Sequence, residues 1–306
     1  MCNVCGCGDG ETRIENPVRP GPAHSHDHPP GHTHSHDHTD SHDHRDPRQS
    51  DLHFGAGPAR VHVAGFSQTE IVQIERNILS KNDRYAENNR QYLAGRGVLT
   101  LNLVSSPGSG KTTLLTTTIR ALVDEVAVAV IEGDQETVKD AERIRETGAT
   151  AIQINTGRGC HLDAHMVGHA LEKLALEARS VLFVENVGNL VCPASFDLGE
   201  DHKVAILAVT EGEDKPLKYP EMFAVSDLMI LNKIDLLPYL EFDVERCIEY
   251  ARRVNPEIEI IQLSATTGKG IDEWLGWIDR RRKTRVDTGI NQRDSISGAP
   301  ARGQPL

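Results

Sequence analysis

The stretch Ser105-Ser-Pro-Gly-Ser-Gly-Lys-Thr-Thr113 follows an apolar run and opens a segment with helical periodicity. Gly108 and Gly110 allow backbone N–H groups to turn inward around an anion, and the N-terminus of the following helix adds positive potential. Lys111 is expected to contact the β- and γ-phosphates of a nucleotide, and the Thr112 hydroxyl to bind Mg²⁺. The first position of this pattern, usually glycine or alanine, is a serine here. The alternative is an ordinary strand–turn–helix connection. The stretch predicts a phosphate-binding loop made of Gly108, Ser109, Gly110, Lys111, Thr112 and Thr113.

Apolar or β-branched runs recur along the chain and alternate with helical patterns. Strands are predicted at 98–105, 126–131, 151–154, 181–185, 204–209, 227–231 and 258–262, and helices at 112–123, 137–146, 162–178, 244–254 and 271–281. Near-continuous apolar strands separated by helices indicate a sheet buried on both faces. The predicted fold class is therefore α/β, a P-loop NTPase with a mostly parallel twisted sheet and helices on both faces.

Asn232-Lys-Ile-Asp235 stands at the end of a predicted strand. The Asp235 carboxylate can accept from guanine N1–H and N2–H₂, whereas adenine would leave this carboxylate unpaired. Lys233 would cover the base, and Ser264-Ala265 fits the loop whose backbone N–H contacts guanine O6. The alternative is a solvated turn after a strand. The pattern favours a GTPase whose base contacts are Asn232, Lys233, Asp235, Ser264 and Ala265.

Two carboxylates end predicted strands near the phosphate loop. Glu185 is followed by Gly188, where many GTPases have Asp-x-x-Gly, and Asp134 ends another strand. Both are candidate Mg²⁺ ligands, together with Thr112. Asp134 could instead cap the following helix. No glutamine is evident for positioning water, so slow, regulatory GTP hydrolysis is expected. The predicted catalytic residues are Lys111, Asp134 and Glu185.

Composition divides the 306 residues into four parts. Residues 1–66 are crowded with His, Asp, Pro, Gly and Ser, which predicts a largely disordered metal-binding tail. Residues 67–97 form a predicted helix and linker, with Ser67 as cap, Gly95 as stop and a polar second half that is solvated or meets a partner. The GTPase domain is predicted at 98–283, and a disordered C-terminal tail at 284–306.

A second cluster of metal-ligand types lies in the two loops expected near the nucleotide. Cys160-His161 follows one predicted strand, and Cys192 follows the loop after Glu185. Two thiolates and an imidazole suit zinc or nickel, and a homodimer would complete the ligand shell. His165, one turn further on, is an additional candidate ligand. Separated cysteines are more often small buried apolar residues, as predicted for Cys247.

The N-terminus carries a third set of candidate ligands. Cys2, Cys5 and Cys7 place three thiolates within six residues, and nine histidines follow between His24 and His44. Thiolates favour soft or borderline ions, while the histidines would bind divalent ions loosely. The alternatives are a reactive thiol cluster and a low-complexity linker. Together the two stretches predict binding of Ni²⁺, and of Zn²⁺ as a second candidate.

Charge and hydropathy exclude several classes of partner. The net charge is −12, only 4% of residues are aromatic, and no basic patch is evident, so nucleic-acid binding is not expected. No apolar run approaches the roughly 20 residues that span a bilayer, and no signal peptide is evident. The six cysteines are typical of reduced thiols rather than a disulfide framework. These features predict a cytoplasmic protein without membrane insertion.

The ordered set of motifs resembles the HypB family of hydrogenase nickel-incorporation GTPases. The matching pieces are residues 2–7, the His-rich stretch, 105–113, 155–163, 185–193 and 232–235. The resemblance covers residues 1–8 and about 67–281. It implies a GTP-regulated nickel chaperone for [NiFe]-hydrogenase maturation, with GTP or GDP, Mg²⁺ and Ni²⁺ as its ligands.

The same resemblance implies specific sites and partners. It places a metal site at Cys160, His161 and Cys192, and a high-affinity nickel site at Cys2, Cys5 and Cys7. It implies a homodimer promoted by nucleotide or metal, a HypA-like zinc protein as partner, and delivery to the hydrogenase large-subunit precursor. Two alternatives remain: a nickel storage or buffer protein, and a metallochaperone GTPase for another enzyme such as urease.

Overall fold

The computed structural model describes residues 68–134, 139–157 and 159–297, with side chains described up to residue 285. The predicted N-terminal tail, its Cys2, Cys5 and Cys7, its histidines and the Ser67 cap lie outside the described residues, as do residues 298–306. No helix in the described ranges is long and apolar enough to cross a membrane.

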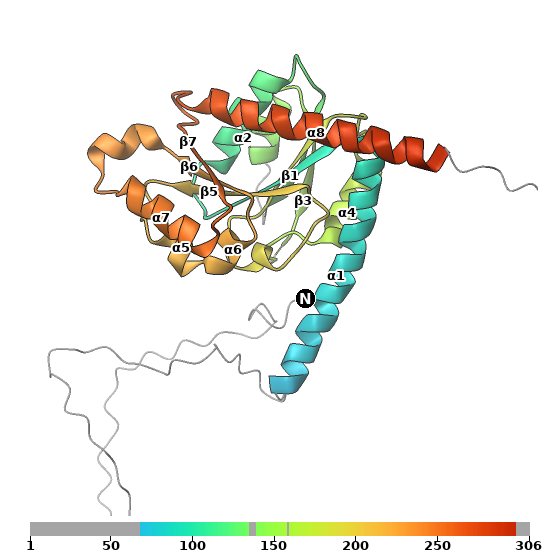
Figure 1. The fold of residues 1–306 in the computed structure, drawn as a ribbon, viewed down its shortest axis with the longest axis horizontal. Coiled ribbons are helices and arrows are strands. Elements are labelled where there is room, and N and C mark those ends of the chain that lie inside the picture. Colours follow the sequence, from blue (N-terminus) through green and yellow to red (C-terminus); the bar gives the residue numbers. More distant parts are fainter. Residues whose placement is uncertain (1–67, 135–138, 158, 298–306) are drawn as a thin grey trace, which may run out of the picture.

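A parallel sheet forms the centre of the structure (Figure 1). Its strands lie in the order β3-β2-β4-β1-β5-β6-β7. The strands are β1 Leu99–Ser105, β2 Val128–Asp134, β3 Thr150–Asn155, β4 Val181–Glu185, β5 His202–Ala208, β6 Leu228–Asn232 and β7 Glu259–Gln262. The central strands β1 and β4 are buried along their whole length, which fits their largely apolar sequences. The exceptions are the buried polar residues Thr100, Asn102, Ser105 and Glu185.

Helices cover both faces of this sheet. They are α1 Gln68–Arg96, α2 Lys111–Leu122, α3 Lys139–Arg145, α4 Ala164–Lys173, α5 Lys215–Lys218, α6 Pro220–Ala224, α7 Val244–Val254 and α8 Ile271–Ser297. Alternate residues of β1 pack on one face against α2, α3 and α8, in a core that includes Trp274 and Trp277. The opposite face packs against α1 and α4 at one end and against α6 and α7 at the other. The predicted fold class is confirmed.

Several predicted boundaries are wrong, for local reasons. Helix α1 passes through Gly95 and ends at Arg96, because Gly97 supplies the left-handed turn with φ +67°. Helix α8 continues to Ser297, beyond residue 284 where a tail is predicted. Arg285 holds this extension, because it pairs with Asp201 at 3.0 Å and donates to the Val98 carbonyl.

The polar second half of α1 is also not simply solvated. Asn82, Ala86 and Asn89 are buried, and α1 packs along α4. The Asn89 Nδ2 donates to the carbonyls of Ala164 and Leu198 at 2.8 and 3.0 Å. The amides of Asn82 and Asn89 are hydrogen-bonded to the backbone at the start of α4 and in the loop before β5, so a polar stripe serves as the packing face.

Candidate nucleotide and metal site

The loop between β1 and α2 has the geometry of an anion cradle. Gly108 and Gly110 have φ of +77° and +92°, which favours glycine at both positions. A Cβ on Gly110 would lie 2.6 Å from the Asn232 amide, so the close approach of these two segments also requires glycine. Lys111 then begins α2 directly after the turn. The backbone therefore places a helix N-terminus where the sequence predicts phosphate binding.

A cavity of about 670 Å³ opens in front of this loop. Its lining contains residues 105–113 together with Glu132, Gly133, Asp134, Asp140, Arg143, Cys160, Glu185, Val187, Gly188, Asn189 and Lys233. The predicted phosphate and carboxylate residues thus share one cavity with a predicted metal ligand, Cys160.

The Glu185 carboxylate is in contact with the phosphate loop. Its Oε1 accepts a 2.7 Å hydrogen bond from the Thr112 hydroxyl and lies 3.4 Å from Lys111 Nζ. The Thr112 hydroxyl is also 3.3 Å from Asp140 Oδ2. Glu185 is only 3% exposed, and its Oε2 has no hydrogen-bond donor among the described residues. A buried carboxylate oxygen without a donor, beside a threonine hydroxyl, fits a site for a hard cation such as Mg²⁺.

Glu132 is a second buried carboxylate, which no sequence motif marks as a site residue. It pairs in register with Glu185 on the neighbouring strand, and its Oε2 also has no donor within the described part of the chain. Burial, followed by the charges of Glu185, Asp134 and Asp140, raises its pKa to about 8. The only sequence signal was its position two residues before Asp134 in the same strand.

The guanine motif is connected directly to the phosphate loop. The Asn232 amide donates to the Ser109 carbonyl at 2.9 Å and accepts from the Ala265 N–H at 3.1 Å. Lys233 Nζ donates to the Gly108 carbonyl at 2.6 Å. Of the motif residues, only Lys233 lines the cavity described above. Asp235, Ser264 and Ala265 are not among its lining residues, so the cavity corresponds to the phosphate end of the predicted site.

The structure brings Cys160, His161 and Cys192 together. The two Sγ atoms lie 2.9 Å apart, and Cys160 Sγ lies 3.5 Å from His161 Nδ1. All three ligand atoms lie within 4.8 Å of one another. Burial lowers the pKa of His161 below its ordinary value of 6.5, which keeps the ring neutral and a nitrogen lone pair available. This donor set suits a zinc or nickel ion.

His165, predicted as an additional candidate ligand, and Cys247, predicted as a small buried residue, both lie outside this cluster. His165 lies on the exposed side of α4, where its Nε2 is 3.1 Å from that of His169. It is not one of the three residues in the cluster. Cys247 is buried inside α7, and burial raises its pKa to about 12. A thiol that remains protonated among apolar residues fits the prediction of a small core residue.

Comparison with known proteins identifies the family. Residues 99–262 match the nucleotide-binding domain described as CobW/HypB/UreG. The chain is 59% identical over 305 residues to hydrogenase maturation factor HypB of Azotobacter vinelandii, covering 95% of this chain and 96% of that protein. The chain belongs to the HypB family of hydrogenase maturation factors. The HypB of Escherichia coli K12 is 56% identical over 289 residues, covering 92% of this chain and 99% of that protein.

Solved HypB structures have the same fold. The crystal structure of HypB from Archaeoglobus fulgidus has a TM-score of 0.63 at 41% identity and covers 66% of this chain and 99% of that one. HypB from Helicobacter pylori, solved in complex with nickel, has a TM-score of 0.64 at 38% identity, with coverage of 67% and 97%. The family resemblance inferred from the motifs is confirmed.

Proposed function

We propose that this chain is a GTP-hydrolysing nickel chaperone that delivers nickel to the [NiFe]-hydrogenase large subunit during maturation. One observation carries the proposal: Cys160 and Glu185 line the same cavity as Lys111. A thiol ligand and the carboxylate beside the phosphate loop are thus close enough for nucleotide and metal to influence each other. Membership of the HypB family supports the hydrogenase target, and the nickel complex of the Helicobacter pylori relative supports the ion.

In the proposed reaction, the residues of the cradle bind and orient GTP. Lys111 neutralises charge on the β- and γ-phosphates, and the guanine base is selected by Asp235. Thr112, Glu185 and Asp134 are the proposed ligands of Mg²⁺, which when bound supplies further charge neutralisation. Hydrolysis is slow, in keeping with a regulatory role.

The proposed coupling runs from the end of β4 to the metal ligands. Glu185 is followed within seven residues by Cys192, so a change at this carboxylate moves the chain that carries a thiolate. We propose that GTP favours one arrangement of Cys160, His161 and Cys192 and that hydrolysis relaxes it, releasing nickel. A ligand shifts such an equilibrium only by its differential affinity for the two states.

The test measures nickel affinity of the full chain carrying Cys2→Ser, Cys5→Ser and Cys7→Ser, with GDP and with a non-hydrolysable GTP analogue. We expect the two nucleotides to give different affinities, and Cys160→Ala to abolish the difference. The buried thiol variant Cys247→Ala is the matched control and should retain it. Equal affinity and equal release rate with both nucleotides would refute the coupling.

The proposed partners are a second copy of this chain, a HypA-like zinc protein and the hydrogenase large-subunit precursor. A homodimer is proposed because the three ligands of one chain leave a four-coordinate ion one donor short. Sizing of the protein with GDP and with the GTP analogue, with and without nickel, tests this. An elution volume that stays equal to that of the Cys160→Ala variant, with either nucleotide and with or without nickel, would count against a regulated dimer.

A urease target is the second candidate. A relative from Helicobacter pylori, 41% identical over 219 residues, is named hydrogenase/urease maturation factor HypB. A deletion strain distinguishes the targets, because loss of hydrogenase activity alone supports the first and loss of both activities supports a shared role.

Deleting residues 9–66 tests the nickel-store alternative. A chaperone should keep most maturation when nickel is ample, whereas a store should lose its role.

A further inference from the structure

Lys203 is a buried cation in a position where the sequence predicts neither binding nor catalysis. It is 7% exposed and lies in β5, which is separated by β1 from the strand that ends at Glu185. Its side-chain partner is Glu200, with Nζ 3.6 Å from Oε1, and both side chains are almost fully buried. Removing an ammonium and a carboxylate from water is costly, and apolar residues of the same volume are often equally stable or more so. Stability alone therefore does not account for this pair.

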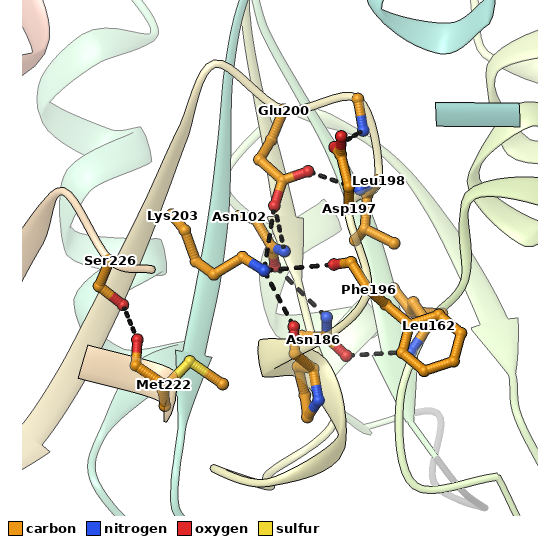
Figure 2. Close-up of polar contacts among 12 residues, drawn as sticks. Asn102, Leu162, Asn186, Phe196, Asp197, Leu198, Glu200, Lys203, Met222 and Ser226 are labelled. Atoms are coloured by element: carbon orange, nitrogen blue, oxygen red, sulfur yellow. Dashed lines mark hydrogen bonds and ion pairs between the residues drawn. The ribbon is translucent and has the colours of Figure 1, made fainter. Parts of the chain in front are cut away.

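The other contacts of the Lys203 ammonium go to the loop that carries Cys192. Its Nζ donates to the carbonyl of Pro193 at 2.9 Å and to the carbonyl of Phe196 at 3.2 Å. Figure 2 shows the ammonium between Glu200 and the Phe196 carbonyl. Three acceptors thus surround the three N–H donors of the ammonium. One of them, the Pro193 carbonyl, lies inside the short turn η1 (Cys192–Ala194), and the other, the Phe196 carbonyl, lies two residues after it. Lys203 thus fixes the backbone next to the thiol.

Lys203 is also held rigidly on its own strand. Its N–H donates to Asp227 Oδ2 at 2.9 Å, and its carbonyl accepts from the Asp227 N–H at 2.9 Å. Through Lys203, the loop that carries Cys192 is attached to the central sheet rather than to another loop. A loop fixed in this way holds its ligand with less freedom than a surface loop would.

A chain of side-chain amides connects Lys203 to the other ligand-bearing loop. Glu200 Oε1 accepts from Asn102 Nδ2 at 3.0 Å, and Asn102 Oδ1 accepts from Asn186 Nδ2 at 3.4 Å (Figure 2). Asn186 Oδ1 accepts from the backbone N–H of Leu162 at 3.0 Å, directly after His161. The buried frame, defined as Asn102, Asn186, Glu200 and Lys203, thus contacts the backbone beside Cys192 and beside His161.

The frame also reaches the nucleotide site through the chain itself. Asn186 follows Glu185, whose carboxylate contacts Thr112 and Lys111. A third side-chain amide connects the same two loops, since Asn189 Nδ2 donates to the Cys160 carbonyl at 3.2 Å. We propose that Lys203 is a positioning residue for the metal site: through the buried frame it sets the separation of Cys160, His161 and Cys192. This rests on the proposed function, because it requires the cluster to bind metal.

We expect the loss of Lys203 to act like the loss of a residue that holds a metal ligand in place without binding the metal itself. Such changes typically lower metal affinity by about 10- to 100-fold while leaving the ligands in place. The single variant Lys203→Met is ambiguous, because it leaves the Glu200 carboxylate buried without its cation and can impair folding. The double variant Lys203→Met/Glu200→Gln removes both charges and still leaves the carbonyls of Pro193 and Phe196 without a donor. It therefore separates positioning from folding.

The experiment uses the full chain with Cys2, Cys5 and Cys7 changed to Ser, and Co²⁺ as the probe. Sulfur-to-cobalt charge-transfer absorption reports thiolate binding, which the histidine tract cannot produce. Thermal unfolding and binding of a GTP analogue to the metal-free protein are measured in parallel. Lys218→Met is the matched control, because Lys218 is exposed and pairs only with Asp214 among its described ion-pair partners.

We expect the double variant to unfold near the reference temperature and to bind the GTP analogue within about twofold of the reference, with Co²⁺ affinity lower by about 10- to 100-fold. Co²⁺ affinity equal to that of the reference would overturn the positioning role. Equal losses of nucleotide and Co²⁺ binding would also overturn it, by showing a general structural role. Absence of the thiolate band in the reference protein itself would instead refute the proposed metal site, and this inference with it.

Discussion

The Thr112 hydroxyl donates a 2.7 Å hydrogen bond to Glu185, across the gap between α2 and the end of β4. Both groups are proposed Mg²⁺ ligands, so bound Mg²⁺ would replace this contact. Glu185→Gln keeps the shape but removes the charge that attracts the cation. We expect the Mg²⁺ concentration for half-maximal GTP hydrolysis to rise at least about tenfold. A Mg²⁺ titration of activity, with the exposed Glu172→Gln as control, checks this; unchanged Mg²⁺ dependence would exclude Glu185 as a ligand or a support.

Cys192 and Cys247 provide a comparison between two thiols of one chain. Cys192 is half-buried beside Cys160, whereas Cys247 is completely buried, with its pKa raised to about 12. In the full chain with Cys2, Cys5 and Cys7 changed to Ser, Cys192→Ser should weaken sulfur-to-cobalt absorption, because only one of the two thiolates of the cluster, Cys160, is left to bind. Cys247→Ser should leave the absorption unchanged but lower the unfolding free energy by about 1–3 kcal/mol, because a hydroxyl is then buried. The reverse pattern would show that the metal cluster is misassigned.

Gly199 determines how closely α1 approaches the loop before β5. Its φ is +90°, and a Cβ would lie 2.6 Å from the Ala86 carbonyl and 2.8 Å from Asn89 Cβ. Gly199→Ala therefore adds a backbone clash to the strain of a left-handed alanine. Gly148 has a similar φ of +87° with nothing within 4 Å, so Gly148→Ala reports the strain alone.

We expect Gly148→Ala to lower the unfolding free energy by about 1–2 kcal/mol, and Gly199→Ala to lower it by about 1–3 kcal/mol more. Denaturant unfolding of the two variants measures the difference. Equal losses of unfolding free energy in the two variants would mean that α1 can move away from the loop without a loss of stability. In that case the buried contacts of Asn89 would not hold α1 in place.

The parts of the fold that were predicted well are those where burial leaves a regular pattern. The bounds of β4 (Val181–Glu185) and α7 (Val244–Val254) agree with the prediction at both ends. The first is buried on both faces, so the four residues before Glu185 are all apolar, and the second is capped by Asp243 and strongly amphipathic. Helices α5 and α6 were missed, because four or five residues containing proline show no helical period.

Candidate site residues were predictable where chemistry and motif coincide, as in the phosphate loop and at Cys160. The role of Lys203 could not be predicted. A lysine is usually exposed, and the partners that accompany its burial here come together only in the folded chain. Glu132 was missed because its importance comes from its register with Glu185 on the adjacent strand. Residues whose roles arise from strand order require the topology, which the sequence pattern does not specify.

Asp235 is the proposed source of guanine specificity. It lies in the turn η2 (Ile234–Tyr239), after the Asn232 and Lys233 contacts that fix this segment to the phosphate loop. Asp235→Asn replaces one of the two carboxylate oxygens by an NH₂ group. The remaining oxygen can still accept from N1–H, but the NH₂ group faces guanine N2–H₂, which is also a donor, whereas it can donate to the O2 of xanthine. We expect GTP affinity to fall at least about 100-fold while XTP binding improves. Competition binding with GTP, XTP and ATP checks this; retained preference for GTP would place base recognition elsewhere.

The ion pair between Arg90 and Asp197 should give a stability difference that depends on pH. Burial raises the pKa of Asp197, but the Gly199 N–H and the Arg90 guanidinium outweigh it and hold the pKa below its usual 3.8. A carboxyl whose folded-state pKa is lowered contributes stability above its unfolded pKa and loses it as the pH falls through the folded-state value.

Asp197→Asn should therefore lower the unfolding free energy at pH 7, by up to about 1 kcal/mol because Asp197 is partly exposed. The difference from the unmodified protein should shrink below pH 3.8, where the carboxyl becomes protonated in the unfolded chain and then in the folded one. Urea unfolding between pH 7 and the lowest pH at which the protein stays folded measures this. Asp214→Asn is the matched control, because its pair with Lys218 is exposed. A constant difference across the range would mean that Asp197 acts through its backbone and packing rather than through its charge.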